Sequence, residues 1–91
     1  MTDADIEAQI FALLAQRSQG ATICPSEVAR ALAPEGDSWR EQMPQVRQVA
    51  QALAQQRRLR VTRSGVPVNA TAPGGPIRLG LVRGDPGGES R

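Results

Sequence analysis

The sequence predicts a small, mainly helical domain that ends in a β-hairpin, and three observations lead to this fold class. The chain has 91 residues, enough for one domain near the lower end of self-sufficient size. Three segments carry apolar residues at helical spacing, and two later segments read as strands. Aromatic residues make up only 2% of the chain, so the core must be built from Ala, Leu, Val and Ile.

The first helix is expected from Asp3 to Gln16 or Arg17. Thr2 is a suitable N-cap, and the acidic residues of the first turn lie where the helix dipole favours negative charge. Its apolar residues recur at helical spacing, with Phe11 at the edge of the stripe: Ile6, Ile10, Leu13 and Leu14. Gly20 is a suitable stop, because glycine readily adopts the left-handed conformation after a helix end.

A second, shorter helix is expected to end by about Ala33. Residues 21–23 precede it and are too few for more than a bridge-length strand. Pro25 fits the first helical position, where its missing N–H costs nothing. Cys24 then falls at the N-cap, and the Glu27 carboxylate can reach back to the N-cap N–H.

The third helix is the main one and is expected from Pro44 to about Arg57. A separate turn over residues 39–43 precedes it, because the residue before a proline is pushed out of the α region. Five residues form its inner stripe: Met43, Val46, Val49, Ala50 and Leu53. Trp39 is interpreted as a core anchor rather than as a residue that stacks on a base.

The C-terminal part predicts two strands joined by a long loop. Residues 59–63 alternate as a strand with their arginines outward, and residues 64–65 form a turn. Residues 66–75 are rich in proline and glycine and are interpreted as a flexible loop. Residues 76–82 form the returning strand, and residues 84–91 a disordered tail without apolar side chains. The candidates for inward positions on the returning strand are Ile77, Leu79 and Leu81.

This order of elements is that of a winged helix, which we expect over residues 1–83. The fold is a helix-turn-helix variant, a three-helix bundle with a two-stranded wing. Its third helix enters the major groove of DNA, and its wing lies beside the backbone. A ferredoxin-like sheet fits less well, because only two strands are strong.

Three strings carry a resemblance to a known family: TICPSEVARAL (22–32), WRxxMxxVR (39–47) and GPIRL (75–79). Over roughly residues 6–80 the chain resembles a family of short bacterial proteins of unknown function. The resemblance implies a winged-helix-like domain and implies no activity.

The charge of the chain is divided between its two halves. Residues 1–41 hold seven acids and three arginines, whereas residues 42–84 hold seven arginines and no acid. All eleven basic residues are arginine, whose planar fork suits phosphates and base edges. A biased codon usage explains the missing lysine equally well, but it does not explain the missing acids. The distribution therefore indicates an anionic partner for the C-terminal half.

The function predicted from this charge and fold is duplex DNA binding through the third helix and an arginine-rich wing. Glutamine suits adenine edges, and arginine suits guanine edges and phosphates. The predicted contact residues are Gln45, Arg47, Gln48, Gln51, Gln55, Arg57, Arg58, Arg60, Arg63 and Arg78. The alternative is a protein-interaction or dimerisation module that does not bind nucleic acid.

Enzymatic activity, a metal and a cofactor are not expected. The chain has no histidine, which removes the commonest general base and the commonest metal ligand. Cys24 is its only cysteine, and a small buried thiol near the helix cap is favoured over a nucleophile. The carboxylates of Asp3, Asp5 and Glu7 are interpreted as helix-cap charges, and Gly74-Gly75 as a turn.

Two arginines within the family-like strings have alternatives that the sequence leaves open. Arg30 is a candidate ion-pair partner of Glu27. Arg78 is a candidate for either a phosphate contact or a salt bridge. The N-terminus is acidic and unlike a secretory peptide, and the apolar runs are too short to cross a membrane. These features predict a cytoplasmic protein without a membrane partner.

Overall fold

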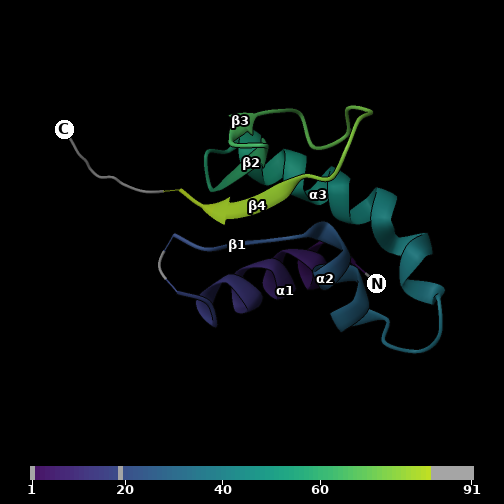
Figure 1. The fold of residues 1–91 in the computed structure, drawn as a ribbon. Helices are drawn as coiled ribbons and strands as arrows, with labels where there is room; N and C mark the ends of the chain where they lie inside the picture. The colour runs from purple at the N-terminus through teal and green to yellow at the C-terminus, as the bar shows by residue number, and fades with distance from the viewer. Residues whose placement is uncertain (1, 19, 83–91) are drawn as a thin grey trace.

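The computed structural model describes residues 2–18 and 20–82. This part of the chain forms a small domain with three α-helices, one 3-10 helix and a four-stranded antiparallel sheet (Figure 1). The elements are α1 (Asp3–Ala15), β1 (Thr22–Ile23), α2 (Pro25–Leu32), η1 (Ser38–Gln42), α3 (Met43–Gln55), β2 (Leu59–Arg63), β3 (Val66–Pro67) and β4 (Arg78–Leu81). The tail predicted over residues 84–91 lies outside the described residues.

The first two helices begin at their predicted N-caps, Thr2 and Cys24, and each cap is hydrogen-bonded to the first turn. Asp5 N–H donates to Thr2 Oγ1 over 3.1 Å, and Thr2 N–H donates to Asp5 Oδ2 over 3.0 Å. At α2, Cys24 N–H donates to Glu27 Oε2 over 2.7 Å. These bonds satisfy N–H groups that have no partner within the helix, which fixes where α1 and α2 begin.

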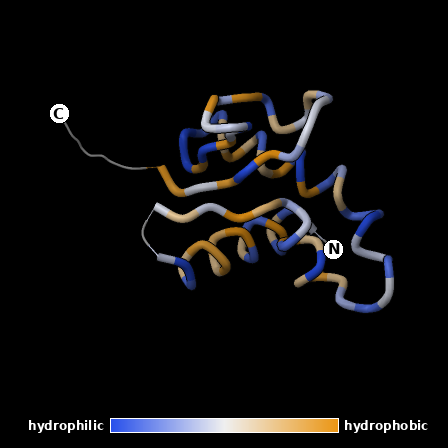
Figure 2. The backbone as a smooth tube through the Cα atoms, in the orientation of Figure 1, coloured by the Kyte–Doolittle hydropathy of each residue, from blue (hydrophilic) through white to orange (hydrophobic). Residues whose placement is uncertain are grey.

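The core is aliphatic and is shared by the three helices and the sheet. The stripe predicted on α3 is confirmed, since Val46, Val49, Ala50 and Leu53 are buried and Met43 is partly buried. The remaining buried hydrophobic residues are Ile6, Ile10, Leu14, Ile23, Val28, Ala29, Leu59, Val61, Ala70, Ile77 and Leu79. Full burial of one such large side chain contributes about 1.5–3 kcal/mol. In Figure 2, hydrophobic residues dominate α1, whereas hydrophilic residues recur along α3.

Trp39 packs against the rim of the core and is only partly buried. The guanidinium groups of Arg30 and Arg40 lie 4.4 and 4.5 Å from the centre of its ring. Glu27 is instead bonded to Arg17 and to the Cys24 N–H. The predicted Arg30–Glu27 pair is therefore wrong, because the indole face attracts the guanidinium and Glu27 has other partners.

The sheet has the strand order β1-β4-β2-β3 and is larger than the predicted two-stranded hairpin. β2 pairs with β4, as predicted, but β1 adds to the far edge of β4 and β3 adds to β2. Residues 66–75 are therefore not a simple flexible loop. They begin with β3, and they include Ala70, which is 0% exposed.

One of the three candidate inward positions on the returning strand is exposed. Ile77 and Leu79 are fully buried, but Leu81 is 47% exposed. Leu81 is the last residue of β4 and pairs with Leu59, the first residue of β2. Strand alternation places it on the inner face, but at the end of the sheet it remains largely uncovered.

Candidate nucleic-acid interface

One side of α3 is open to solvent. Gln48, Ala52 and Gln55 are exposed and recur at helical spacing, opposite the side that carries Val46 and Leu53. We call Gln48, Ala52 and Gln55 the free face of α3. The helix has 13 residues and is therefore about 20 Å long. The free face presents two amides around a small alanine and carries no charge.

A second side of α3 is occupied by the chain that follows β3. Gln51 Oε1 accepts the Ala70 N–H over 2.8 Å, and Arg47 Nη1 donates to the Ala70 carbonyl over 3.5 Å. Ala70 is completely buried, so its backbone groups need partners inside the protein. The α3 side chains provide both. Gln51 and Arg47, which sequence reasoning assigned to DNA, therefore hold a loop in place.

The third side of α3 lies beside the acidic end of α1. Gln45 Nε2 donates to Asp3 Oδ1 over 2.9 Å. The Glu7 carboxylate forms an ion pair with Arg58 over 2.8 Å, and Arg58 also lies 5.4 Å from the centre of the Phe11 ring. Two carboxylates thus border the free face, and Arg58 partly neutralises one of them.

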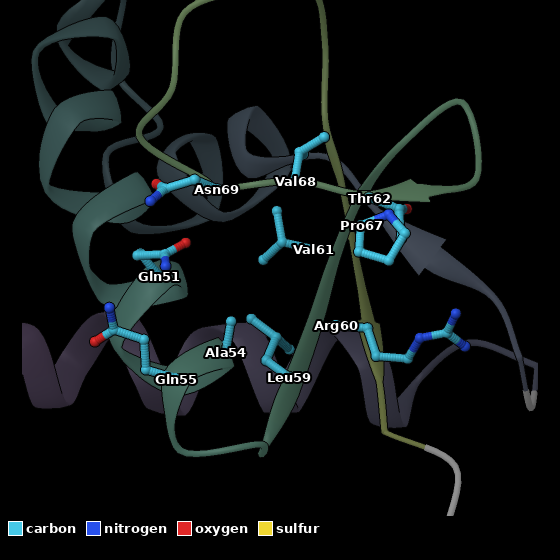
Figure 3. Close-up of a pocket in the computed structure, with 10 residues that line it drawn as sticks. All are labelled: Gln51, Ala54, Gln55, Leu59, Arg60, Val61, Thr62, Pro67, Val68 and Asn69. Carbon is cyan, nitrogen blue, oxygen red and sulfur yellow. The ribbon is translucent and has the colours of Figure 1, made fainter.

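A groove of about 490 Å³ separates the C-terminal half of α3 from the β2–β3 hairpin. Figure 3 shows the amides of Gln51, Gln55 and Asn69 along one side of the groove, with Leu59 and Val61 beside them. Its floor is apolar and its rim carries amides.

The arginines that follow α3 do not gather on one surface. Arg57 ends the helix in the left-handed region (φ 61°), and its side chain is exposed. The Arg58 N–H returns to the Leu53 carbonyl over 2.9 Å, which is the bond of a Schellman cap. Arg63 turns back beneath the loop before β4, where its Nε donates to the Gly75 carbonyl over 3.1 Å. The expectation that every arginine of β2 points outward is wrong for Arg63, because strand alternation places it on the face of Leu59 and Val61.

The remaining two predicted residues, Arg60 and Arg78, lie on the sheet face turned away from the core. Figure 3 shows Arg60 extending from β2 away from the α3 amides. Arg78 Nε donates to Thr22 Oγ1, and Arg78 Nη2 donates to the Thr22 carbonyl, each over 2.9 Å. Both bonds are to Thr22, a neutral residue of β1, which neither sequence-based alternative included.

The Glu27 carboxyl is the clearest electrostatic feature outside α3. The hydrogen bond from the Cys24 N–H lowers its pKa, and the nearby Arg17 and Arg78 guanidinium groups lower that pKa further. The Cys24 thiol accepts a hydrogen bond from Ser26 Oγ over 3.1 Å. Glu27 therefore connects Arg17, which follows α1, with the start of α2.

Residues 2–18 and 20–82 contain no group of three or more His, Cys, Asp or Glu side chains placed to hold a metal ion. Over the same residues, no helix has the length and hydropathy needed to cross a membrane.

Comparison with known proteins gives one informative result. No curated protein matches the chain. A family described as "Protein of unknown function (DUF3253)" matches residues 3–82, which is nearly the whole domain. The family-like strings at residues 22–32, 39–47 and 75–79 all lie within this match. The chain therefore belongs to the DUF3253 family of proteins of unknown function.

Proposed function

We propose that this chain is a winged-helix domain that binds duplex DNA by placing the free face of α3 in the major groove. The strand between the first two helices pairs with the last strand, and α3 leads into the β2–β4 pair. This topology supports the winged-helix assignment, with the β2–β3 hairpin and the following loop as the wing.

The observation that carries the proposal is the free face itself. The major groove is about 12 Å wide and admits one α-helix. Gln48 and Gln55 lie seven residues apart and are exposed, so both amides can reach base edges, where glutamine pairs with adenine. Ala52 lies between them and allows close approach. Arg57, exposed directly after α3, supplies a phosphate contact.

The structural roles of other predicted residues reduce the number of side chains that can contact DNA in this proposal. Arg47, Gln51, Arg58 and Arg63 are bonded within the domain, so they are not primary DNA contacts in this proposal. Asp3 and Glu7 lie along one edge of the free face and repel phosphates. The DNA is therefore expected on the opposite edge, beside the loop that contains Ala70.

The proposal is tested by fluorescence anisotropy of a labelled generic duplex at 50 and 200 mM salt. The single phosphate contact of this proposal, Arg57, predicts that affinity falls about three- to fourfold over this range. The double variant Gln48→Glu, Gln55→Glu should weaken binding at least about tenfold, since each good base contact contributes about 1–3 kcal/mol.

The matched control is Ala8→Glu, Ala12→Glu, which adds the same charge at exposed positions of α1. It should change affinity far less than the α3 variant. Equal losses in the two variants would assign the binding to overall charge rather than to α3. No binding by the unchanged protein at 50 mM salt and tens of micromolar protein would end the proposal.

A second candidate, a protein-interaction module, is favoured by the groove between α3 and the hairpin. Its apolar floor and amide rim suit a peptide or a second copy of the chain better than they suit DNA. Measurement of the molar mass by light scattering at low and high salt distinguishes the candidates. Val68 lines the groove. A dimer that persists at high salt but does not form in the Val68→Lys variant would favour the protein-interaction module.

A further inference from the structure

The outer face of the sheet contains a small hollow that the proposed DNA interface does not use. Arg60 on β2, Gly80 on β4 and Thr22 on β1 lie side by side in the strand register. The residues next to them in the strands, such as Val61 and Leu79, are buried on the opposite face. Arg60 and Thr22 therefore point outward on either side of a position that has no side chain.

Two turns and a second threonine complete this hollow. Gly20 lies at one side, before β1, and Gly65 lies at the other, in the β2–β3 turn. Thr62 also lines the hollow, from the next outward position of β2. The hollow measures about 130 Å³, well below the roughly 300–1,000 Å³ of pockets that enclose drug-sized ligands. Its occupant must be a small group.

The polar groups around the hollow are mainly available as donors. The Arg60 side chain is exposed and forms no hydrogen bond or ion pair with the described residues. Thr22 Oγ1 already accepts a hydrogen bond from Arg78 Nε, which leaves the Thr22 hydroxyl proton free to donate elsewhere. Arg78 thus orients Thr22 and adds a second positive charge next to the hollow.

Among residues 2–18 and 20–82, no carboxylate lines the hollow. Arg78 also helps to lower the pKa of Glu27, but the Glu27 carboxylate is held by Arg17 and by the Cys24 N–H. The local field therefore favours an anion.

We propose that this hollow binds one tetrahedral oxyanion, a phosphate group. The Arg60 fork pairs with two of its oxygens, and the hydroxyls of Thr22 and Thr62 donate to the others. Arg78 is a positioning residue that fixes Thr22. Because the hollow opens on the sheet face turned away from the core, it does not depend on whether α3 binds DNA.

The direct test is a titration of the ¹⁵N-labelled full chain with inorganic phosphate, followed by amide chemical shifts. Sodium chloride at equal ionic strength is the reference. Saturating shifts at Thr22, Arg60, Thr62 and Gly80, with a Kd of order 1 mM, support the site. Shifts that stay linear in phosphate concentration, or that match those in chloride, overturn it.

Two variants locate the binding. Gly80→Ala keeps every charge but fills the gap, because its Cβ would lie 3.2 Å from Thr22 Cγ2. Arg60→Gln removes the main donor at an exposed position and should leave the fold intact. Each change should weaken phosphate binding at least tenfold.

The matched control for Arg60→Gln is Arg40→Gln, which loses the same charge at a distant, 66% exposed side chain. It should leave the phosphate Kd within twofold of the unchanged protein. Phosphate affinity that Arg60→Gln does not alter, or that Arg40→Gln lowers equally, would overturn the proposal.

The source of the phosphate group is distinguished by a second titration with a short unlabelled DNA duplex. Displacement of inorganic phosphate by the duplex, with shifts at Thr22 and Gly80, assigns the hollow to the DNA backbone. If the duplex shifts only the amides of Gln48 and Gln55, the hollow is assigned to free phosphate or a phosphate monoester. A chain that binds phosphate but no duplex would refute only the DNA proposal.

Discussion

Gln51 and Gln55 lie one turn apart on α3, but only Gln51 is bonded to another part of the domain. Its Oε1 accepts the Ala70 N–H, whereas the Gln55 side chain is exposed and forms no hydrogen bond with the described residues. The two side chains are chemically identical. The chain that passes over one side of α3 produces the difference. A polar residue on a helix surface thus indicates an exposed or hydrogen-bonded face, and not a binding role by itself.

Arg60 and Arg63 on β2 repeat this contrast. Arg60 points to solvent, whereas Arg63 lies under Gly74 and Gly75 with its Nη2 atom buried and without a hydrogen-bond partner among the described residues. Three residues of separation place them on opposite faces of the strand. One arginine is available to a ligand, and the other holds the loop before β4.

The largest expected effect is that of Gly74→Ala, which disturbs the loop that covers the Arg63 side chain. Gly74 has φ 142°, a conformation nearly exclusive to glycine, and an added Cβ would lie 2.6 Å from Arg63 Nη1. The backbone strain alone should reduce the free energy of unfolding by about 1–3 kcal/mol. Urea unfolding followed by circular dichroism measures the change.

The neighbouring substitution Gly75→Ala is the matched control. Its Cβ would meet no atom within 4 Å. It should alter the free energy of unfolding by no more than about 0.5 kcal/mol. A loss as large as that of Gly74→Ala would show that neither the backbone conformation of Gly74 nor its contact with Arg63 makes Gly74 necessary.

The next effect is that of Gln51→Ala, which should cost about 1–2 kcal/mol because it leaves the buried Ala70 N–H without its acceptor. Gln55→Ala should be neutral within about 0.5 kcal/mol. Thermal melting compares the two. Hydrogen exchange at the Ala70 amide adds a local measure and should accelerate only in Gln51→Ala. Equal destabilisation by both changes would remove the distinction between the two sides of α3.

The smallest effect is expected for Glu27→Gln and depends on pH. The Cys24 N–H lowers the pKa of Glu27 in the folded protein, so its stabilisation is present above the pKa of the unfolded chain. It is lost as pH falls through the lower, folded pKa. Because the Glu27 side chain is 32% exposed, the difference at pH 7 should be under about 1 kcal/mol. Urea midpoints of both proteins should converge at acidic pH, once Glu27 is protonated in the folded protein, and a constant difference would contradict this assignment.

Most local structure was predictable because its causes lie within a few residues. The caps at Thr2 and Cys24, the buried stripe on α3 and the strand at residues 59–63 follow from spacing and from residue chemistry. The turn at Ser64-Gly65 was also expected. Short two-residue strands give almost no periodic signal, so β3 was missed and β1 was expected only as a bridge.

The candidate site was less predictable. Gln48, Gln55, Arg57 and Arg60 are exposed as expected, but Gln51 and Arg47 are engaged by Ala70, a residue with no distinctive sequence signal. The sequence did contain one signal for the hollow on the outer face of the sheet. Gly80 interrupts a strand pattern, which often marks a close approach of another group.

The sequence by itself determined the helices, their caps, the division of charge and most of the residues that form the core. These depend on backbone preferences and on the burial of apolar side chains at regular spacing. Only the tertiary structure decided which polar side chains are free. An arginine or glutamine reaches several ångströms, and its partner is set by the segment that folding brings beside it. That is why Arg63 and Gln51 hold loops, while Arg60 and Gln55 remain available to a ligand.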